Sequence, residues 1–136
     1  MDPALLDTDT LSEVLKQRNA NVRKHAKQYL RSHGQFALSA VTRFEMIRGY
    51  KEVGATTQLA RFHTFCAHSL ILPLTDAIFD RAADLWVVAR QGGHPCSDAD
   101  LLIAATAIEQ GRRLVTGNAG HFNWIAGLVV DDWRQP

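Results

Sequence analysis

Five short apolar runs, separated by longer segments with helical spacing, limit the folds available to this chain. Each run has two or three residues, a length that suits a short buried strand better than a buried helix. Strands that alternate with helices are typical of an α/β domain with a parallel sheet between helical layers. We therefore expect a three-layer α/β/α sandwich around a central, mainly parallel sheet. The predicted strands are residues 4–6, 36–38, 70–72, 114–115 and 128–130.

The segments between these runs predict six helices. The sequence Thr10-Leu11-Ser12-Glu13 resembles a capping box, which would start a helix shortly after the first strand. Asp7 would then stand at the carboxyl end of that strand, the edge at which open α/β sheets bind ligands. The predicted helices are residues 10–18, 20–32, 41–50, 57–68, 76–91 and 98–110.

Size and composition favour one domain that carries no global charge signal. A chain of 136 residues fits a single compact domain, residues 1–136. Its 15 Lys and Arg balance 14 Asp and Glu, so any site for a polyanion must be local. Cys66 and Cys96 form no CxxC pair, and no signal peptide or membrane-spanning run is present. We expect a cytoplasmic protein with reduced cysteines.

Four segments join an apolar run to a carboxylate or its amide, at Asp7, Glu45, Asp100 and Asn118. A buried, ionised carboxylate is disfavoured unless it is paired, hydrogen-bonded or bound to a metal. Several carboxylates together repel one another and raise their own pKa values. Mg²⁺ or Mn²⁺ removes that penalty, because these ions prefer oxygen ligands. If the four segments meet in space, they predict a hard-metal site.

Each acid also has an interpretation that needs no metal. Asp7 could cap the following helix, because Asp is a preferred N-cap residue. Glu45 could pair with Arg48 on an exposed helix face, an interaction of about 0.2–0.5 kcal/mol. Asp100 follows Ser97, so its charge could simply favour a helix N-terminus.

Neighbouring polar residues have similar alternatives. Asp9 suits the first turn of a helix better than a metal. Asp98 is a supplementary acid, but residues two apart on a helix point roughly 200° away from each other, so it should not share an ion with Asp100. Asn118 could be a turn residue that still orients a water or an acid. Thr116 could donate a hydrogen bond to a carboxylate or simply end a strand.

Taken together, four motifs resemble the PIN-domain ribonucleases, and more narrowly the VapC-type toxins of toxin–antitoxin pairs. Those proteins open with an apolar strand and LDTN or LDTD, continue with SxxTxxE and a nearby glycine, then with DxxIAA, and end with VTxN and a phenylalanine. The matching residues are Leu6-Asp7-Thr8-Asp9, then Ser39, Thr42, Glu45 and Gly49, then Asp100 with Ile103, Ala104 and Ala105, and lastly Val115-Thr116-Gly117-Asn118 with Phe122. They occur in the family's order over nearly the whole chain.

The resemblance implies a compact α/β ribonuclease whose acidic cluster binds Mg²⁺ or Mn²⁺. Asp7, Glu45 and Asp100 match the family's metal-binding acids, and Asn118 matches a polar residue beside them. Many relatives carry a fourth acid where Asn118 or His121 stands here, so the number of metal ions is left open. The family also implies an RNA substrate, a cognate antitoxin and a homodimer.

Two other functions remain open at this point. Asp7-Thr8-Asp9 also resembles the motif of haloacid-dehalogenase-type phosphatases, in which the first acid is the nucleophile and the second an acid/base. Leu11 stands where Thr or Val is usual there, and no later GDxxxD block follows. With Asn118 in place of an acid, the chain could instead be a catalytically inert PIN-like binding module.

The remaining charged residues support weaker interpretations. The six histidines show no HxxxH pair, so a zinc site is not expected. A basic stretch could contact RNA phosphates or be a solvated helix face. It comprises Arg18, Arg23, Lys24, His25, Lys27 and Arg31.

Overall fold

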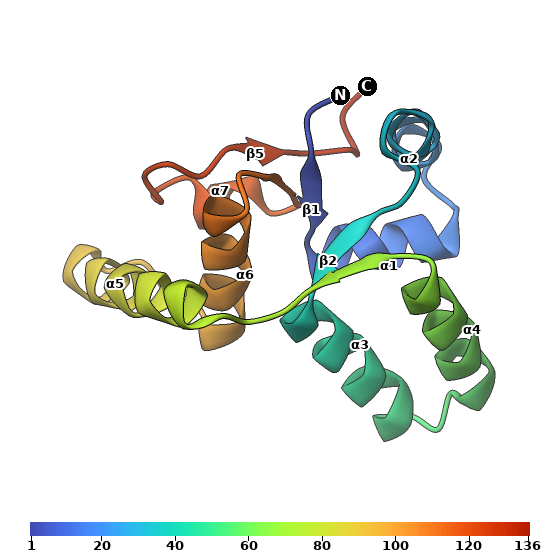
Figure 1. The fold of residues 1–136 in the computed structure, drawn as a ribbon, viewed down its shortest axis with the longest axis horizontal. Helices are drawn as coiled ribbons and strands as arrows, with labels where there is room; N and C mark the ends of the chain where they lie inside the picture. Colours follow the sequence, from blue (N-terminus) through green and yellow to red (C-terminus); the bar gives the residue numbers. More distant parts are fainter.

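Figure 1 shows the fold of the computed structural model, which describes all 136 residues. Its strands pair only in parallel. β1 (Ala4–Leu6) pairs with β4 (Arg113–Val115), and β4 pairs with β5 (Val130–Asp131). β2 (Ala37–Ser39) pairs with β3 (Leu70–Leu72). β1 and β2 lie side by side without a shared ladder, so the predicted single sheet is formed in two hydrogen-bonded parts.

Seven helices surround these strands, and none is long and apolar enough to cross a membrane. Six of them were predicted, and their ends lie within two residues of the prediction. The seventh, α7, is one turn, too short for any periodicity to show. The helices are α1 (Thr8–Lys16), α2 (Ala20–His33), α3 (Ala40–Glu52), α4 (Thr56–Ala67), α5 (Asp76–Gly92), α6 (Asp98–Glu109) and α7 (Ala119–Phe122).

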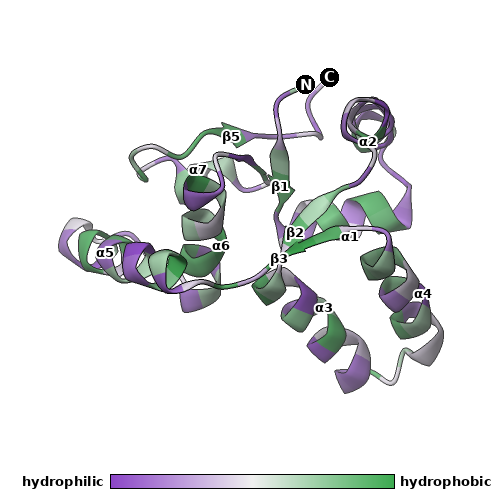
Figure 2. Ribbon diagram, in the orientation of Figure 1, coloured by the Kyte–Doolittle hydropathy of each residue, from purple (hydrophilic) through white to green (hydrophobic).

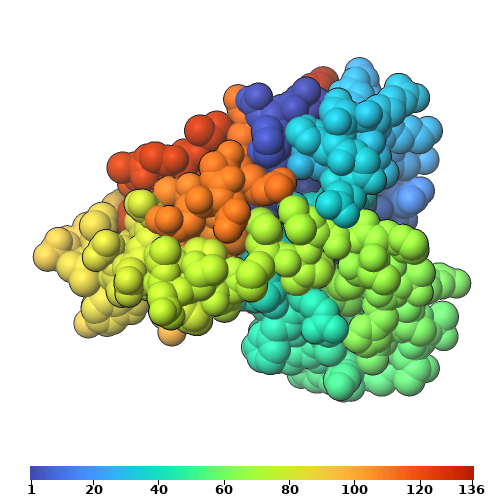
Figure 3. Space-filling view, viewed as in Figure 1, coloured from blue at the N-terminus to red at the C-terminus, as the bar shows by residue number.

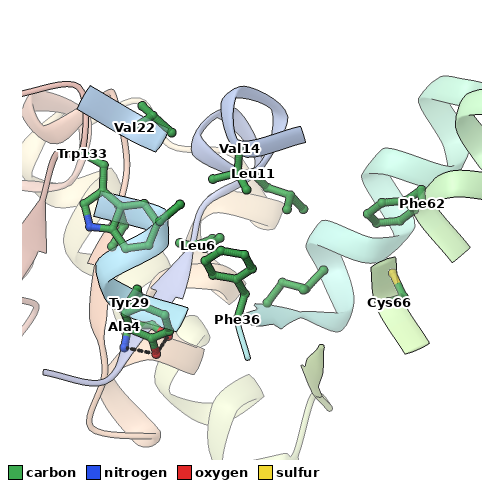
Figure 4. Packing of buried hydrophobic residues seen from close by; sticks show 13 residues of the cluster. Ala4, Leu6, Leu11, Val14, Val22, Tyr29, Phe36, Phe62, Cys66 and Trp133 are labelled. Atoms are coloured by element: carbon green, nitrogen blue, oxygen red, sulfur yellow. Dashed lines mark hydrogen bonds between the residues drawn. The ribbon is translucent and has the colours of Figure 1, made fainter. Parts of the chain in front are cut away.

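The two faces of the sheet bury two separate cores, because successive side chains of a strand point to opposite faces. Leu6 and Leu38 pack with residues of α1, α2 and α4, as Figure 4 shows for the labelled part of this cluster. Leu5 and Leu114 pack on the other face with residues of α3, α6 and α7. The predicted three-layer arrangement is therefore confirmed.

Hydropathy follows the same layers. The strands are coloured mainly as hydrophobic, whereas α2 is mostly hydrophilic (Figure 2). Only Val22, Ala26 and Tyr29 of α2 are buried, on a single face of the helix. The predicted basic stretch therefore lies largely in solvent, with Arg23, Lys24 and neighbouring cations exposed.

The start of α1 differs from the prediction. The N-cap is Asp7, whose Oδ1 accepts a hydrogen bond from the Thr8 N–H at 2.8 Å. Thr10 and Leu11 are buried inside the helix, so the predicted capping box at residues 10–13 is wrong. Strand and helix thus join without a loop, and this junction holds Asp7 rigidly at the carboxyl end of β1.

The start of α6 agrees with the prediction. The Ser97 Oγ accepts a hydrogen bond from the Asp100 N–H at 3.1 Å, which makes Ser97 the N-cap. Leu101 and residues 103–107 are buried almost all round the helix. Because α6 is buried on almost every side, its position is fixed by packing. Its first turn lies at the same edge of the sheet as Asp7.

Candidate metal centre

Asp7 is buried and held from three directions. Its N–H donates to the Val115 carbonyl at 2.9 Å, and the residue is only 7% exposed. Oδ1 accepts from the Thr8 N–H, and Oδ2 accepts from the Thr116 hydroxyl at 2.8 Å. The parallel pairing of β1 with β4 places Thr116 beside Asp7, and of the two interpretations left open for Thr116 the structure shows the hydrogen bond to a carboxylate.

The surroundings of Asp7 oppose its negative charge. The pKa of the Asp7 carboxyl is raised to about 6, mainly because the group is buried and to a smaller extent because the charges of Asp9 and Asp100 lie nearby. The hydrogen bonds from Thr116 and Thr8 lower the pKa and offset only part of this effect. A divalent cation would stabilise the ionised form that the protein alone disfavours.

Asp100 lies in the first turn of α6 and contacts a histidine from α7. Its Oδ2 is 2.9 Å from His121 Nε2, and both side chains are about one-third exposed or less. Asp98, two residues earlier, is exposed and forms no side-chain hydrogen bond. The structure thus separates the two acids as the helix geometry predicts.

Cys96 lies beside this pair, although no HxxxH spacing in the sequence indicates the group. Ligand atoms of Cys96, Asp100 and His121 all lie within 4.8 Å of one another. Burial raises the pKa of the Cys96 thiol to about 11, with smaller contributions from the charges of Asp100 and Asp7. A zinc site was not expected from the sequence, because the histidines form no HxxxH pair within one helix. The group of Cys96, Asp100 and His121 instead comes from three separate segments.

Glu45 approaches the cluster through Thr8. Its Oε1 accepts a hydrogen bond from the Thr8 hydroxyl at 2.9 Å, and that hydroxyl lies 3.3 Å from Thr42 Oγ1. The alternative partner, Arg48, is largely exposed and stands 3.9 Å from Glu45 Oε2. The hydrogen bond is the shorter contact, and it directs Glu45 toward the residue next to Asp7.

Asn118 is exposed at the start of α7, and its side chain caps no helix. Its N–H donates to Thr116 Oγ1 at 3.1 Å, which orients the hydroxyl that binds Asp7. Asp9 also supports this turn, because its Oδ2 accepts from the Gly117 N–H at 3.0 Å. The Asp9 side chain thus links α1 to the segment after β4. This structural role agrees with the prediction that Asp9 is not a metal ligand.

Asp7, Asp100 and Glu45 offer the carboxylate oxygens that a hard divalent cation prefers, but the structure does not bring the three carboxyl groups within 4.8 Å of one another. All three supply carboxylate oxygens, and the two oxygens of Asp7 each accept only one hydrogen bond. Each oxygen therefore keeps a lone pair for a ligand. The guanidinium of Arg134 donates a hydrogen bond to the Gly117 carbonyl in the turn after β4. No ion pair joins the basic residues of α2 to the acids.

Comparison with known proteins places the chain in a family. The sequence profile of the PIN domain matches residues 4–127, which include every acid described above. The chain belongs to the PIN-domain family. Membership confirms the resemblance drawn from the four motifs and removes the support for a haloacid-dehalogenase-type phosphatase.

Relatives of this PIN-domain protein extend over nearly its full length. It is 27% identical over 130 residues to the tRNA(fMet)-specific endonuclease VapC of Shigella flexneri, covering 95% of this chain and 96% of the relative. Its fold is similar to that of VapBC2 from Rickettsia felis bound to a promoter DNA fragment, with a TM-score of 0.85, 21% identity, and coverage of 96% and 98% of the two chains. A toxin–antitoxin complex from Klebsiella pneumoniae matches with a TM-score of 0.66, 28% identity, and coverage of 93% and 95%.

Proposed function

We propose that this PIN-domain protein is a metal-dependent endoribonuclease that acts as the VapC-type toxin of a toxin–antitoxin pair. Asp7, Glu45 and Asp100 hold Mg²⁺ or Mn²⁺, and Asn118 lies beside them. The main support is the buried Asp7 carboxylate, which stands beside a second acid and has a raised pKa. Such a group is costly unless it serves a cation or a proton transfer.

The side chains have separate tasks in this proposal. A cation held by Asp7, Glu45 and Asp100 would lower the pKa of a bound water and neutralise charge that develops on the scissile phosphate. The Thr116 hydroxyl and Thr8 N–H fix the orientation of Asp7. The Thr8 hydroxyl positions Glu45. No side-chain nucleophile is required, because hydrolysis uses water.

RNA is the substrate that this proposal predicts, and a transfer RNA is the first class to test. RNA ends mapped after expression of the wild type should show discrete new cuts that are absent from cells expressing Asp7→Asn. In vitro, EDTA should stop cleavage, and excess Mg²⁺ or Mn²⁺ should restore it. Cleavage that persists in chelator would contradict the proposal. A wild type that binds no Mn²⁺ in calorimetric titration would favour an inert binding module.

A groove beside Glu45 is the surface that we propose for the antitoxin. It has a volume of about 620 Å³ and lies between α1, α3 and α4. Leu15, Met46, Tyr50 and Phe62 supply its apolar lining, and Lys16 and Arg61 add positive charge. A groove of this kind suits an apolar segment with nearby acidic groups, and it would bring that segment to the acidic cluster.

Filling this groove should weaken antitoxin binding. A Cβ atom added at Gly49 meets no atom within 4 Å, so we expect α3 to accept Gly49→Leu and the longer side chain to fill part of the groove that Gly49 lines. We expect the dissociation constant for the product of the adjacent gene to rise about tenfold or more, because apolar contact area is lost. Ala60→Leu is the matched control, since this exposed position on α4 does not line the groove. If both variants raised the dissociation constant equally, the groove would be excluded as the antitoxin-binding surface.

A homodimer is also part of the proposed assembly. Helix α5 extends from one side of the molecule (Figure 3) and exposes Phe79, Trp86, Val87 and Val88. Apolar side chains gathered on one exposed helix are typical of an association surface. A second copy of the chain is the partner that we expect there. A purely monomeric mass in sedimentation equilibrium at high protein concentration would contradict it.

A further inference from the structure

Three ligands of different chemistry meet at one edge of the acidic cluster. Cys96 comes from the loop before α6, Asp100 from the first turn of α6, and His121 from α7. Their ligand atoms lie within 4.8 Å of one another, and no other group of three such residues occurs in the chain. All three are partly exposed, so an ion can reach them.

This donor set differs from the one that suits Mg²⁺. Thiolate sulfur and imidazole nitrogen are ligands of Zn²⁺, whereas Mg²⁺ takes oxygen ligands and several waters. In a tetrahedral Zn²⁺ site the donor atoms lie about 3.3–3.6 Å apart. The ligand atoms of the present group, which all lie within 4.8 Å of one another, are close to that spacing. Three protein ligands leave a fourth position open.

His121 decides the character of the group. The imidazole already directs Nε2 at Asp100 Oδ2, across 2.9 Å, and its ring packs edge-on against Phe122. Phe122 is buried, so the imidazole is held in place from one side. With a carboxylate at position 121 the group would consist mainly of oxygen donors.

We propose that Cys96, Asp100 and His121 form a Zn²⁺ site that shares Asp100 with the Mg²⁺ site, so that bound Zn²⁺ inhibits the nuclease. Divalent zinc binds sites with nitrogen and sulfur ligands far more tightly than magnesium does. Zn²⁺ would therefore draw the Asp100 carboxylate away from Asp7. Binding at this site does not depend on the proposed function, whereas inhibition rests on it.

Co²⁺ is a suitable probe, because it replaces Zn²⁺ and shows a thiolate-to-metal charge-transfer band that Zn²⁺ lacks. Titrating the untagged, metal-free protein with Co²⁺ should produce this band with one ion per chain. Cys96→Ser should abolish the band, and His121→Gln should weaken Co²⁺ binding about tenfold or more. Cys66→Ala is the matched control, because Cys66 is a buried core residue of α4 outside the group and should leave the band intact.

Three results of the titration would overturn the site. They are the absence of a charge-transfer band in the wild type, its persistence in Cys96→Ser, and its loss in folded Cys66→Ala. Circular dichroism of each variant checks that the fold is intact. Competition by added Zn²⁺ should bleach the Co²⁺ band, and failure to bleach it would exclude zinc as the preferred ion.

The inhibition is tested separately on RNA cleavage in excess Mg²⁺. The Zn²⁺ concentration that halves the rate should rise about tenfold or more in Cys96→Ser, with each variant compared with its own rate in Mg²⁺ alone. Equal sensitivity of both proteins, or activation by Zn²⁺, would overturn the inhibitory role. A Co²⁺ band in a protein that cleaves no RNA would instead contradict only the proposed function.

Discussion

Replacing Asp100 by Asn should lower the Mg²⁺-dependent rate of RNA cleavage about 10³-fold. The amide keeps the size of the carboxyl group but removes the negative charge that binds the cation. The fold should survive, because the cap of α6 uses the backbone N–H of residue 100. The amide oxygen can still accept a hydrogen bond from His121 Nε2. Initial rates at saturating Mg²⁺ measure the loss.

Asp98→Asn is the matched control for this variant. Both acids stand in the first turn of α6, so both variants lose a similar favourable interaction with the helix dipole, about 0.3–1 kcal/mol. Asp98 is exposed and forms no side-chain hydrogen bond, so its replacement should change the rate less than about twofold. A comparable loss in both variants would show that charge at the helix end, rather than metal binding by Asp100, supports activity.

Asp7→Asn should stabilise the metal-free protein at pH 8 while removing its activity. Burial raises the pKa of Asp7 from 3.8 to about 6, which corresponds to about 3 kcal/mol of destabilisation of the folded state when the carboxyl is ionised. Asn carries no charge at any pH. It can also keep both hydrogen bonds, with its oxygen accepting from the Thr8 N–H and its amide donating to Thr116 Oγ1.

The pH dependence follows from the raised pKa. Protonated Asp7 favours the folded state, so its contribution to stability is fully present below pH 3.8 and is lost as the pH rises through about 6. The difference between Asp7→Asn and the wild type should therefore be small near pH 4 and largest above pH 7. Denaturant unfolding in EDTA at both pH values measures the free energy of unfolding.

Added Mg²⁺ should reverse the order of stability, because it binds the wild type and not Asp7→Asn. Asp9→Asn serves as the control. Its carboxylate is exposed and accepts hydrogen bonds from the N–H groups of Thr10 and Gly117, so removing the charge should bring no gain in stability. If Asp7→Asn were less stable than the wild type at pH 8 without metal, ionised Asp7 would not destabilise the folded state and the prediction would be wrong.

Local patterns predicted most of the secondary structure because short apolar runs and helical spacing need no distant partner. The strands and six helices lie within two residues of their predicted bounds. The exceptions have local causes. Asp7 competes successfully with Thr10 as the cap of α1, because it directly follows the strand and its side chain reaches the Thr8 N–H. Helix α7 is a single turn.

The residues of the candidate site were predictable only in part. Asp7, Glu45 and Asp100 were chosen from motifs, and the structure links Asp7 with Asp100 by charge and Glu45 with Thr8 by a hydrogen bond. Their assignment as metal ligands stays a prediction, as does the role of Asn118. Cys96 and Thr8 were missed. The four-residue spacing of Cys96 and Asp100 was the one local signal that could have suggested Cys96.

The amino-acid order by itself determined the alternation of strands and helices, the two faces of each strand, and the acids that end several of its segments. These properties depend on neighbouring residues, whose spacing decides which side chains avoid water. Only the tertiary structure decided that Cys96 and His121 meet Asp100, and that the Thr116 hydroxyl binds Asp7. Those contacts join segments that are distant in the chain, and they exist because parallel pairing and the burial of α6 bring the segments to one edge of the sheet.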